Sequence, residues 1–450
     1  MVTLIEPSVL IKTFFTKTKC EVNKVKKSNF IIEMAVENGY LVYNTLSKEL
    51  LFLTNDEYLC YMKCEFASSN KLFDYLLEHL FLVADEKDEF KFLNEIKQFI
   101  MLFEKNDTKL FTILTTLDCN ARCFYCYEQR LSNSNMSLNT ADKISRYIID
   151  NCKDKKVRFN WFGGEPLYNS TIIDLICEQL QNNNIDFESE MISNAYLFDE
   201  NTIYKSVEKW KLKKVQVTID GTENVYNKTK NYIYKNNTSP FRTVINNIEN
   251  LLKANIFVNI RLNLTNRNFY DLNNLIEYLK MKFAKYININ VYIGIVADYK
   301  NLENIWGTDE RKETLDKYFI LENKLFESGL KRVKKLSNLI GIGKCMAQSK
   351  NAIVIAPNGD FCRCEHYSSD IAYYNIHTEE YREELYKEWD VMLQKNDNCK
   401  NCNYLPMCDI NLKCPSFKSF KCNIDEKKAM IYPLKVAIKT YYNYWLRNQL

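Results

Sequence analysis

The sequence predicts an α/β protein with a partial, TIM-like (β/α)6 barrel, an N-terminal winged-helix-like α+β module and a C-terminal cysteine-rich domain. Three observations lead to this prediction. At 450 residues the chain exceeds what one ordinary core accommodates. Strand-type and helix-type segments alternate between residues 111 and 293, and eight of the 16 cysteines lie between residues 345 and 422. We therefore expect domains at 1–106, 107–336 and 337–450.

The N-terminal module is predicted from three short apolar runs followed by three amphipathic stretches. A turn at Glu37-Asn38-Gly39 separates the first two runs. Strands are expected at 29–35, 40–44 and 49–53, and helices near 55–66, 70–79 and 87–104. Three strands followed by three helices are typical of a winged-helix-like module.

The barrel is predicted from six apolar runs of strand type, separated by amphipathic helical stretches. The expected strands are Phe111–Leu117, Val157–Phe162, Phe187–Ile192, Val215–Ile219, Ile256–Leu264 and Ile287–Ile293. The expected helices are 141–152, 170–181, 243–254, 270–283, 308–336 and 436–450. Strands that alternate with helices imply a parallel sheet with right-handed crossovers, which curl the sheet toward a barrel. Six units instead of eight predict a barrel that is open on one side.

Composition and charge exclude two classes of protein. The 61 basic and 57 acidic residues are scattered along the chain, so no sustained basic stripe marks a nucleic-acid-binding surface. No segment approaches the ~20 apolar residues of a membrane span, and no signal-peptide pattern is present. We therefore expect a cytoplasmic protein. In that reducing compartment its cysteines should serve as metal ligands or catalytic thiolates instead of forming disulfides.

Cys119, Cys123 and Cys126 directly follow the first predicted barrel strand. Three thiolates this close in sequence can bind three irons of a [4Fe–4S] cubane, which leaves the fourth iron open, as in a catalytic metal site. The alternative is part of a zinc site with a remote fourth ligand. The chain has only three histidines and none is near this loop in sequence, which argues against zinc.

Polar or glycine-rich segments follow the next three predicted strands. They are Gly163-Gly164-Glu165-Pro166, Ser193-Asn194 and Asp220-Gly221-Thr222. In a parallel barrel the carboxyl ends of all strands lie on one face, where active sites are built. We therefore expect these segments to meet the cysteine loop at the mouth of the barrel.

The cysteine spacings of three and two residues, the aromatic Tyr125 before the last cysteine and the order of the polar segments resemble the radical SAM superfamily. The resemblance implies a [4Fe–4S] cluster on Cys119, Cys123 and Cys126. It also implies reductive cleavage of S-adenosylmethionine to a 5′-deoxyadenosyl radical. Tyr125 should then lie near the adenine.

The same resemblance assigns further contacts to S-adenosylmethionine. Gly163-Gly164-Glu165 should hold its amino group, because a cationic amine needs acceptors. Ser193 and Thr218 occupy positions that resemble contacts to the ribose or the carboxylate. Arg261 and Lys230 are further candidates for the carboxylate or the ribose, and a surface ion pair explains Lys230 at least equally well.

Eight cysteines follow the barrel, in a pattern that resembles the SPASM extension with its auxiliary [4Fe–4S] clusters. The resemblance implies that Cys345, Cys364 and Cys414 bind one auxiliary cluster, and that Cys399, Cys402, Cys408 and Cys422 bind a second. Cys362 either completes the first cluster or leaves an open iron there for a substrate thiolate. Five residues separate Cys408 from Cys414 where the family pattern has three. Cys399-x2-Cys402 alone also fits a zinc ribbon.

Auxiliary clusters of this kind imply a peptide or protein substrate. The N-terminal module resembles the leader-peptide recognition elements of ribosomal peptide maturation systems, although a cap for the barrel mouth is another possible role. We predict a peptide maturase that modifies a ribosomally made precursor, with thioether cross-linking from Cys as the expected reaction. The alternatives are an anaerobic sulfatase maturase that forms formylglycine, carbon–carbon cross-linking, epimerisation, and a non-catalytic electron carrier. The expected partners are a precursor peptide with a leader segment and a flavodoxin or ferredoxin reductant.

Overall fold

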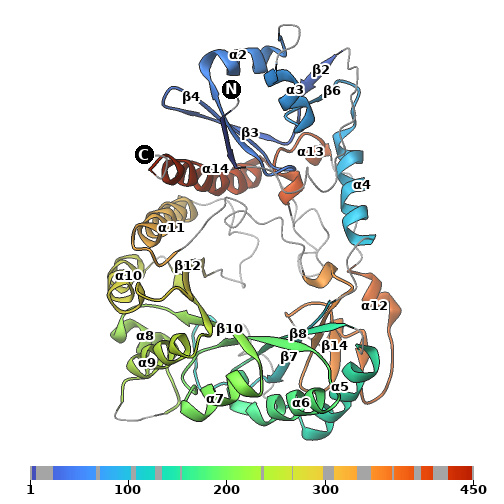
Figure 1. The fold of residues 1–450 in the computed structure, drawn as a ribbon, viewed down its shortest axis with the longest axis vertical. Helices are drawn as coiled ribbons and strands as arrows, with labels where there is room; N and C mark the ends of the chain where they lie inside the picture. The colour runs from blue at the N-terminus through green and yellow to red at the C-terminus, as the bar shows by residue number, and fades with distance from the viewer. Residues whose placement is uncertain are drawn as a thin grey trace. The chain divides into compact units, whose positions relative to one another are not determined.

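The computed structural model describes most of the chain (Figure 1). The described residues are 3–6, 24–66, 71–102, 108–126, 134–152, 155–234, 238–265, 267–296, 309–331, 346–366, 369–389, 397–408 and 424–447. The chain forms two compact units. The first consists of Met1–Phe103, Val333–Gly343 and Val391–Leu450, and the second of Glu104–Arg332 and Lys344–Asp390. None of the described helices is long and apolar enough to cross a membrane.

The second unit contains a nine-stranded sheet in the order β12-β11-β10-β9-β8-β7-β13-β14-β15. Its first six strands are arranged in chain order, each parallel to the next. They are β7 (Thr108–Thr116), β8 (Lys156–Gly163), β9 (Phe187–Ser193), β10 (Leu212–Ile219), β11 (Phe257–Leu264) and β12 (Ile289–Ile295). These strands correspond to the six predicted ones, so the predicted partial (β/α)6 barrel is confirmed.

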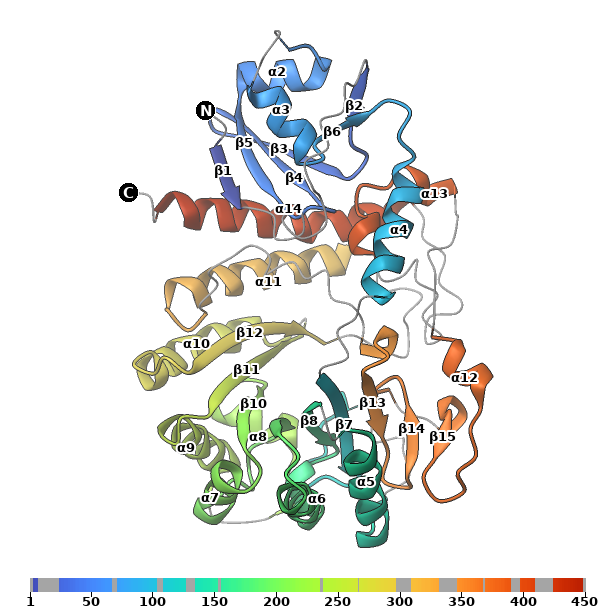
Figure 2. The same cartoon turned by 45° about the vertical axis from the view of Figure 1, so that its right-hand side comes forward.

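Helices follow the barrel strands and cover one side of the sheet. They are α5 (Leu138–Asn151), α6 (Ser170–Asn182), α7 (Glu200–Glu208), α8 (Glu223–Lys230), α9 (Pro240–Lys253), α10 (Phe269–Phe283) and α11 (Asp309–Glu327). Figure 2 shows α5, α6, α9 and α10 along the outer side of the sheet. Val215 and Val217 of β10 are fully buried in the core between sheet and helices, whereas Gln216 and Thr218 on the other face are partly exposed. The inner face of the barrel is therefore the polar one.

Part of the cysteine-rich region extends the barrel sheet. β13 (Ala352–Ile355) pairs in parallel with β7, and β14 (Asp360–Cys362) and β15 (Tyr374–Asn375) continue the sheet as antiparallel strands. Val354 and Cys362 pack with Leu114 of β7 in one apolar cluster. This pairing of the cysteine-rich region with the barrel was not predicted from the sequence.

The first unit contains an antiparallel sheet in the order β1-β5-β4-β3. Its strands are β1 (Thr3–Glu6), β3 (Ile31–Val36), β4 (Gly39–Asn44) and β5 (Leu50–Thr54), and its helices include α2 (Asn55–Lys63), α3 (Lys71–Glu78) and α4 (Glu89–Leu102). The three strands and three helices predicted here are all present. The sequence analysis missed β1 and the short paired strands β2 (Val25–Lys27) and β6 (Leu82–Ala84). Thr54 and Glu57 form a capping box, so α2 begins directly after β5.

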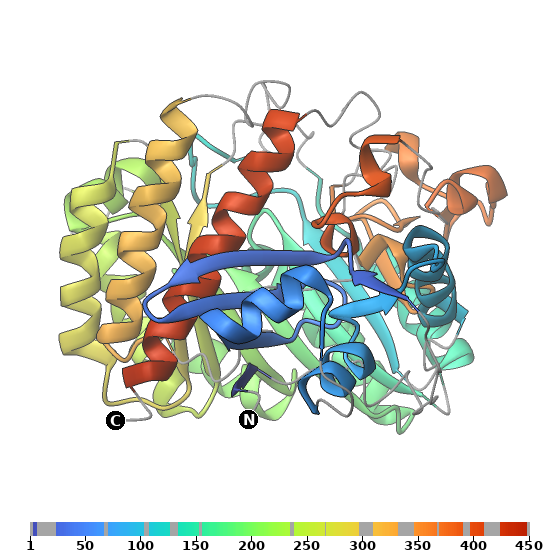
Figure 3. The ribbon, with the colours of Figure 1, turned by 90° about the horizontal axis from the view of Figure 1, so that it is seen from above.

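Different parts of the chain cover the two faces of this sheet. Tyr61, Leu72 and Leu76 of α2 and α3 pack on one face. Leu434 and Ile438 of α14 (Ile424–Arg447) pack on the other. Figure 3 shows α14 crossing the strands. The predicted terminal helix is present, but it begins at Ile424 and not at residue 436.

The cysteine segment 397–408 also belongs to the first unit. Leu405 packs in an apolar cluster with Phe30, Leu46, Leu80, Val83 and Leu93. Thr45 Oγ1 donates a hydrogen bond to the carbonyl of Asn403 at 2.6 Å, and Asn403 Nδ2 donates to the carbonyl of Ile31 at 3.1 Å. The segment 337–450, predicted as one domain, thus contributes to both units. The three-domain division stays a prediction.

We expect Leu405→Ala to destabilise the first unit. Leu405 is 1% exposed, and truncation of a buried leucine costs about 2–5 kcal/mol. The urea midpoint of the first unit should fall when the full chain is unfolded and followed by circular dichroism. Leu59→Ala is the matched control, because Leu59 is 55% exposed on α2 of the same unit. It should change stability by less than about 0.5 kcal/mol. Equal midpoints for the two variants would contradict this packing.

Candidate active site at the carboxyl ends of the barrel strands

The loop with Cys119, Cys123 and Cys126 follows β7 at the carboxyl end of the barrel sheet. Burial, together with the charges of Glu165, Cys123 and Cys126, raises the pKa of the Cys119 thiol to about 12. Thiolates that repel one another in this way are stabilised by a metal between them, and soft thiolates are the ligands of iron–sulfur clusters. Nδ2 of the neighbouring Asn120 is buried and has no hydrogen-bond partner within the described residues, so it can donate to a cluster sulfur. The donor set therefore fits an iron–sulfur cluster.

The backbone at Gly163 and Gly164 packs directly against this loop. The amide of Gly164 donates to the carbonyl of Thr116 at 3.0 Å, and the amide of Glu165 donates to the carbonyl of Asp118 at 2.9 Å. A Cβ on Gly163 would lie 2.1 Å from the Thr116 carbonyl oxygen, and one on Gly164 would lie 2.3 Å from the Asp118 oxygen. Gly163 also has a φ of +112°, which side chains disfavour. Both positions therefore require glycine.

The carboxylate of Glu165 joins the loops after β8 and β9. Glu165 is fully buried. Its Oε1 accepts from Ser193 Oγ at 2.8 Å and from the Leu167 amide at 3.3 Å, and its Oε2 accepts from the Asn194 amide at 2.8 Å. Burial raises the pKa of Glu165 to about 7, although these hydrogen bonds and the charge of Lys230 lower it in part. The predicted residues Glu165 and Ser193 are thus in direct contact.

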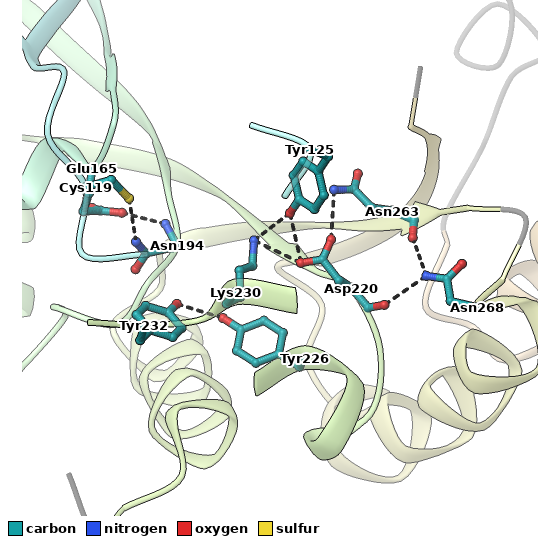
Figure 4. Close-up of polar contacts among 10 residues, drawn as sticks. All are labelled: Cys119, Tyr125, Glu165, Asn194, Asp220, Tyr226, Lys230, Tyr232, Asn263 and Asn268. Atoms are coloured by element: carbon teal, nitrogen blue, oxygen red, sulfur yellow. Dashed lines mark hydrogen bonds and ion pairs between the residues drawn. The ribbon is translucent and has the colours of Figure 1, made fainter. Parts of the chain in front are cut away.

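Asn194 connects this carboxylate to the cysteine loop. Its backbone amide binds Glu165, and its Nδ2 donates to Asn120 Oδ1 at 2.6 Å and lies 3.8 Å from Cys119 Sγ (Figure 4). Three strand ends, those of β7, β8 and β9, therefore meet at one place, as expected for a parallel barrel.

A second buried group joins the cysteine loop to β10 and α8 (Figure 4). Tyr125 OH donates to Asp220 Oδ2 at 3.0 Å, Lys230 Nζ donates to Tyr125 OH at 3.0 Å, and Lys230 Nζ lies 3.1 Å from Asp220 Oδ2. Burial lowers the pKa of Lys230, but the charges of Asp220, Tyr125 and Cys123 outweigh it and raise that pKa well above its usual value. Lys230 is 4% exposed, so the surface ion pair considered for it is wrong.

Asn263 is a site residue that the sequence analysis missed. It lies near the end of β11, and its Nδ2 donates to Asp220 Oδ1 at 3.0 Å. Asn268 Nδ2 donates to the carbonyls of Asp220 and Asn263 at 3.0 and 2.8 Å. A buried polar residue at the end of a predicted barrel strand was the available signal, as for the first four strands.

Thr218 and Arg261 lie beside each other on β10 and β11. Both side chains are partly exposed. Arg261 passes over Gly294 of β12, where a Cβ would lie 2.3 Å from Arg261 Nε. Within the described residues neither is hydrogen-bonded to Glu165 or Asp220, and their contacts to a cofactor stay predictions.

The cysteines predicted to bind auxiliary clusters are described only in part. Cys345, Cys414 and Cys422 lie outside the described residues. Cys362 and Cys364 belong to the second unit, and Cys399, Cys402 and Cys408 to the first. Among the residues that the structure describes, which include Cys119, Cys123 and Cys126, no three or more His, Cys, Asp or Glu side chains are spaced as ligands of a metal ion. Cluster binding by any of these cysteines therefore stays a prediction.

A cavity of about 680 Å³ is lined by residues of strands β7 to β10 and of the segment 346–352, and none of its lining residues belongs to the cysteine loop. Two ion pairs line it, Arg158–Glu188 at 2.6 Å and Lys214–Glu190 at 2.7 Å. Asn160 and Gln216 add amide groups. The inner face of the barrel thus offers polar groups of both signs.

Comparisons with known proteins agree with this architecture. Residues 113–279 match the Radical SAM superfamily. An uncharacterised protein of Methanocaldococcus jannaschii is 29% identical over 166 residues, 36% of this chain and 54% of that protein, so the chain spans about half the length of this relative. A cysteine-type anaerobic sulfatase-maturating enzyme of Clostridium novyi is 23% identical over 352 residues, 67% of this chain and 91% of that enzyme.

Two solved structures have a similar fold. They are native anSMEcpe with bound AdoMet, and the same protein with bound AdoMet and the Cp18Cys peptide. Their TM-scores are 0.58 and 0.57 at 17% identity, and each match covers 76% of this chain and 99% of theirs.

We expect Gly164→Ala to displace the cysteine loop, because the new Cβ would collide with the Asp118 carbonyl. Such overpacking costs on the order of 1–3 kcal/mol, which corresponds to roughly 5- to 150-fold more frequent opening of the loop. The rate at which iodoacetamide alkylates Cys119 in reduced, metal-free protein should rise accordingly, as measured by mass spectrometry. Gly329→Ala is the control: its Cβ would meet no atom within 4 Å, so any strain at its φ of +75° involves no contact with the cysteine loop. An unchanged rate at Cys119 in the Gly164 variant would contradict the close approach.

Proposed function

We propose that the chain is a radical SAM enzyme, since residues 113–279 match that superfamily, and that its substrate is a ribosomally made precursor peptide. The expected reaction is thioether cross-linking from a cysteine of that precursor. The observation that carries the radical chemistry is the buried Glu165 carboxylate, held beside a three-cysteine loop at the barrel mouth.

Cys119, Cys123 and Cys126 would hold the [4Fe–4S] cluster, and the fourth iron would remain for S-adenosylmethionine. With both groups bound, the cofactors supply an electron and a 5′-deoxyadenosyl radical that removes a hydrogen atom from the substrate. The chain's own residues bind and orient these groups and keep water from them.

Glu165 has the capacity to bind the amino group of S-adenosylmethionine. A carboxylate has about four acceptor positions. Two donors occupy Oε1, and one, the Asn194 amide, occupies Oε2. One acceptor position on Oε2 is left for a cationic amine, and Ser193 and Asn194 fix the direction in which it points.

The C-terminal cysteines support two auxiliary clusters. In the SPASM pattern Cys364 binds one of them with Cys345 and Cys414, and Cys399, Cys402 and Cys408 bind the other with Cys422. Cys362 is fully buried and packs against Leu114, Leu117, Val354 and Ala372. These apolar contacts favour a core role for Cys362, which would leave an open iron for a substrate thiolate.

The N-terminal module supports a leader-dependent substrate. Within the described residues β3 is an edge strand of its sheet, paired only with β4. An extended peptide can add to such an edge through main-chain hydrogen bonds, which bind many sequences. At the start of this strand the carbonyl of Ile31 is taken by Asn403, so a leader would pair with β3 beyond that residue.

The alternative is an anaerobic sulfatase maturase that forms formylglycine. The Clostridium novyi relative carries that name, and its similarity to this chain favours the alternative. The match with anSMEcpe leaves 24% of this chain uncovered, because it spans 76% of it and 99% of the other protein. The uncovered share leaves room for a further module, which a leader-dependent maturase would use. Carbon–carbon cross-linking uses the same site.

The first test is cofactor cleavage by the anaerobically reconstituted protein. Three cubanes would bring about twelve irons per chain, and dithionite with S-adenosylmethionine should release 5′-deoxyadenosine. Cys123→Ala should abolish that release and lower the iron content by about one cubane.

The second test is co-expression with a cysteine-rich peptide encoded nearby, followed by mass measurement. A loss of two hydrogens per bond supports cross-linking, whereas conversion of Cys to an aldehyde in a sulfatase peptide supports the alternative. If no 5′-deoxyadenosine forms, the proposal fails.

Binding of S-adenosylmethionine should weaken as the pH falls through 7. The raised pKa of about 7 means that Glu165 binds a proton below this pH. The neutral acid then loses its charge-assisted hydrogen bond to the amine. The dissociation constant should rise by up to about tenfold per pH unit below 7. In the Glu165→Gln variant the dissociation constant should be higher at every pH, and it should lack the rise below pH 7 that protonation of Glu165 causes. Parallel profiles for the two proteins, measured by isothermal titration between pH 6 and 8, would argue against the role of Glu165.

A further inference from the structure

Lys230, the last residue of α8, contacts the cysteine loop at two points. Its Nζ donates to Tyr125 OH at 3.0 Å, and its backbone carbonyl accepts from the Arg122 amide at 2.8 Å. Tyr125 and Arg122 lie on either side of Cys123. The end of α8 thus holds the loop on both sides of a proposed iron ligand.

Asp220 completes this group and anchors it to the barrel. Asp220 Oδ2 accepts from both Tyr125 OH and Lys230 Nζ. Its other oxygen accepts from Asn263 Nδ2, and its backbone carbonyl accepts from Asn268 Nδ2. The three polar atoms of Tyr125, Asp220 and Lys230 lie 3.0 to 3.1 Å apart in a closed triangle. Rotation of the Tyr125 side chain would break two hydrogen bonds at once.

A cation is needed at the centre of this group. Asp220 is 2% exposed, and a buried carboxylate is stable only when it is paired and hydrogen-bonded. Lys230 Nζ supplies that charge and keeps a donor for Tyr125, since an ammonium has three. It also lies 5.8 Å from the ring centre of Tyr226, within cation–π range.

We propose that Lys230 is a positioning residue: by holding the Tyr125 hydroxyl with Asp220, it fixes the cysteine loop and the face that the loop presents to the adenine of S-adenosylmethionine. The part that concerns the adenine rests on the proposed function. The part that concerns the loop does not. Lys230 then acts on S-adenosylmethionine through Tyr125 and not as the carboxylate or ribose contact that the family resemblance suggested.

The test uses a double-mutant cycle between Lys230→Met and Tyr125→Phe. Tyr125→Phe keeps the ring and removes only the hydroxyl. Lys228→Met is the matched control, because Lys228 is exposed on the same helix. Asp220→Asn combined with Lys230→Met removes both buried charges and replaces Lys230→Met if that variant does not fold.

The first readout is amide hydrogen exchange of residues 117–126 in the anaerobically purified full chain, which needs no activity. Each single variant should exchange about tenfold faster than the wild type, and the double variant should be no faster than the quicker single one. Lys228→Met should match the wild type. Unchanged exchange in both single variants overturns the proposal, as does a double variant whose rate is the product of the two single effects.

The second readout is steady-state release of 5′-deoxyadenosine. The KM for S-adenosylmethionine should rise about tenfold in each single variant, with kcat within about twofold and the iron content unchanged. A fall in kcat and iron content at constant KM would show that Lys230 has a merely structural role. It would overturn the proposal that Lys230 positions the face of the loop that contacts the adenine. A wild-type protein that releases no 5′-deoxyadenosine refutes the proposed function, and the hydrogen-exchange result then decides the role of Lys230 in the loop by itself.

Discussion

The close approach of two backbone segments, the end of β7 and Gly163-Gly164 after β8, is the constraint on which the site depends. Two amide-to-carbonyl hydrogen bonds join them, and no side chain fits between them at either glycine. This contact fixes the first cysteine loop relative to Glu165, and Glu165 in turn fixes Ser193 and Asn194. The position of the loop is therefore set by a backbone packing arrangement, which explains why two adjacent glycines stand at the end of β8.

The parallel order of the barrel strands brings these segments together. The six barrel strands β7 to β12 all end on the same side, so the polar residues at the ends of β7, β8, β9 and β10 need no long-range contact of their own to meet. The cysteine-rich part of the chain joins the same sheet, because β13 pairs with β7. Cys362 is the last residue of the next strand, β14, and Cys364 follows it two residues later. The rest of that part, from Cys399 to α14, packs instead on the sheet of the N-terminal module. A single stretch of sequence therefore stabilises both units.

Local pattern was sufficient to predict most elements of the fold, because the barrel strands are apolar runs of five to nine residues with clear helical periodicity between them. It was also sufficient to place Glu165 and Ser193, since each directly follows a strand. It failed where a residue's role depends on a distant partner. Lys230 looks like any exposed helical lysine until the fold brings it to Asp220 and Tyr125. The pairing of β13 with β7 was missed for the same reason, because nothing in the adjacent sequence marks the partner. Asn263 was missed although it is a polar residue at the end of a predicted barrel strand.

The two buried carboxylates of the site differ in how their charge is balanced, and this difference indicates where a ligand belongs. Asp220 has a cation, Lys230, at 3.1 Å, and both of its oxygens are hydrogen-bonded. Glu165 is just as buried, but within the described residues it makes no ion pair and is held only by neutral donors. Its raised pKa is the expected consequence, because burial without a cation favours the protonated acid. A cationic amine at the remaining acceptor position would restore the balance that Lys230 provides for Asp220. Under the proposed function a bound amine would therefore stabilise the ionised form of Glu165, whereas the charge of Asp220 is already balanced by Lys230.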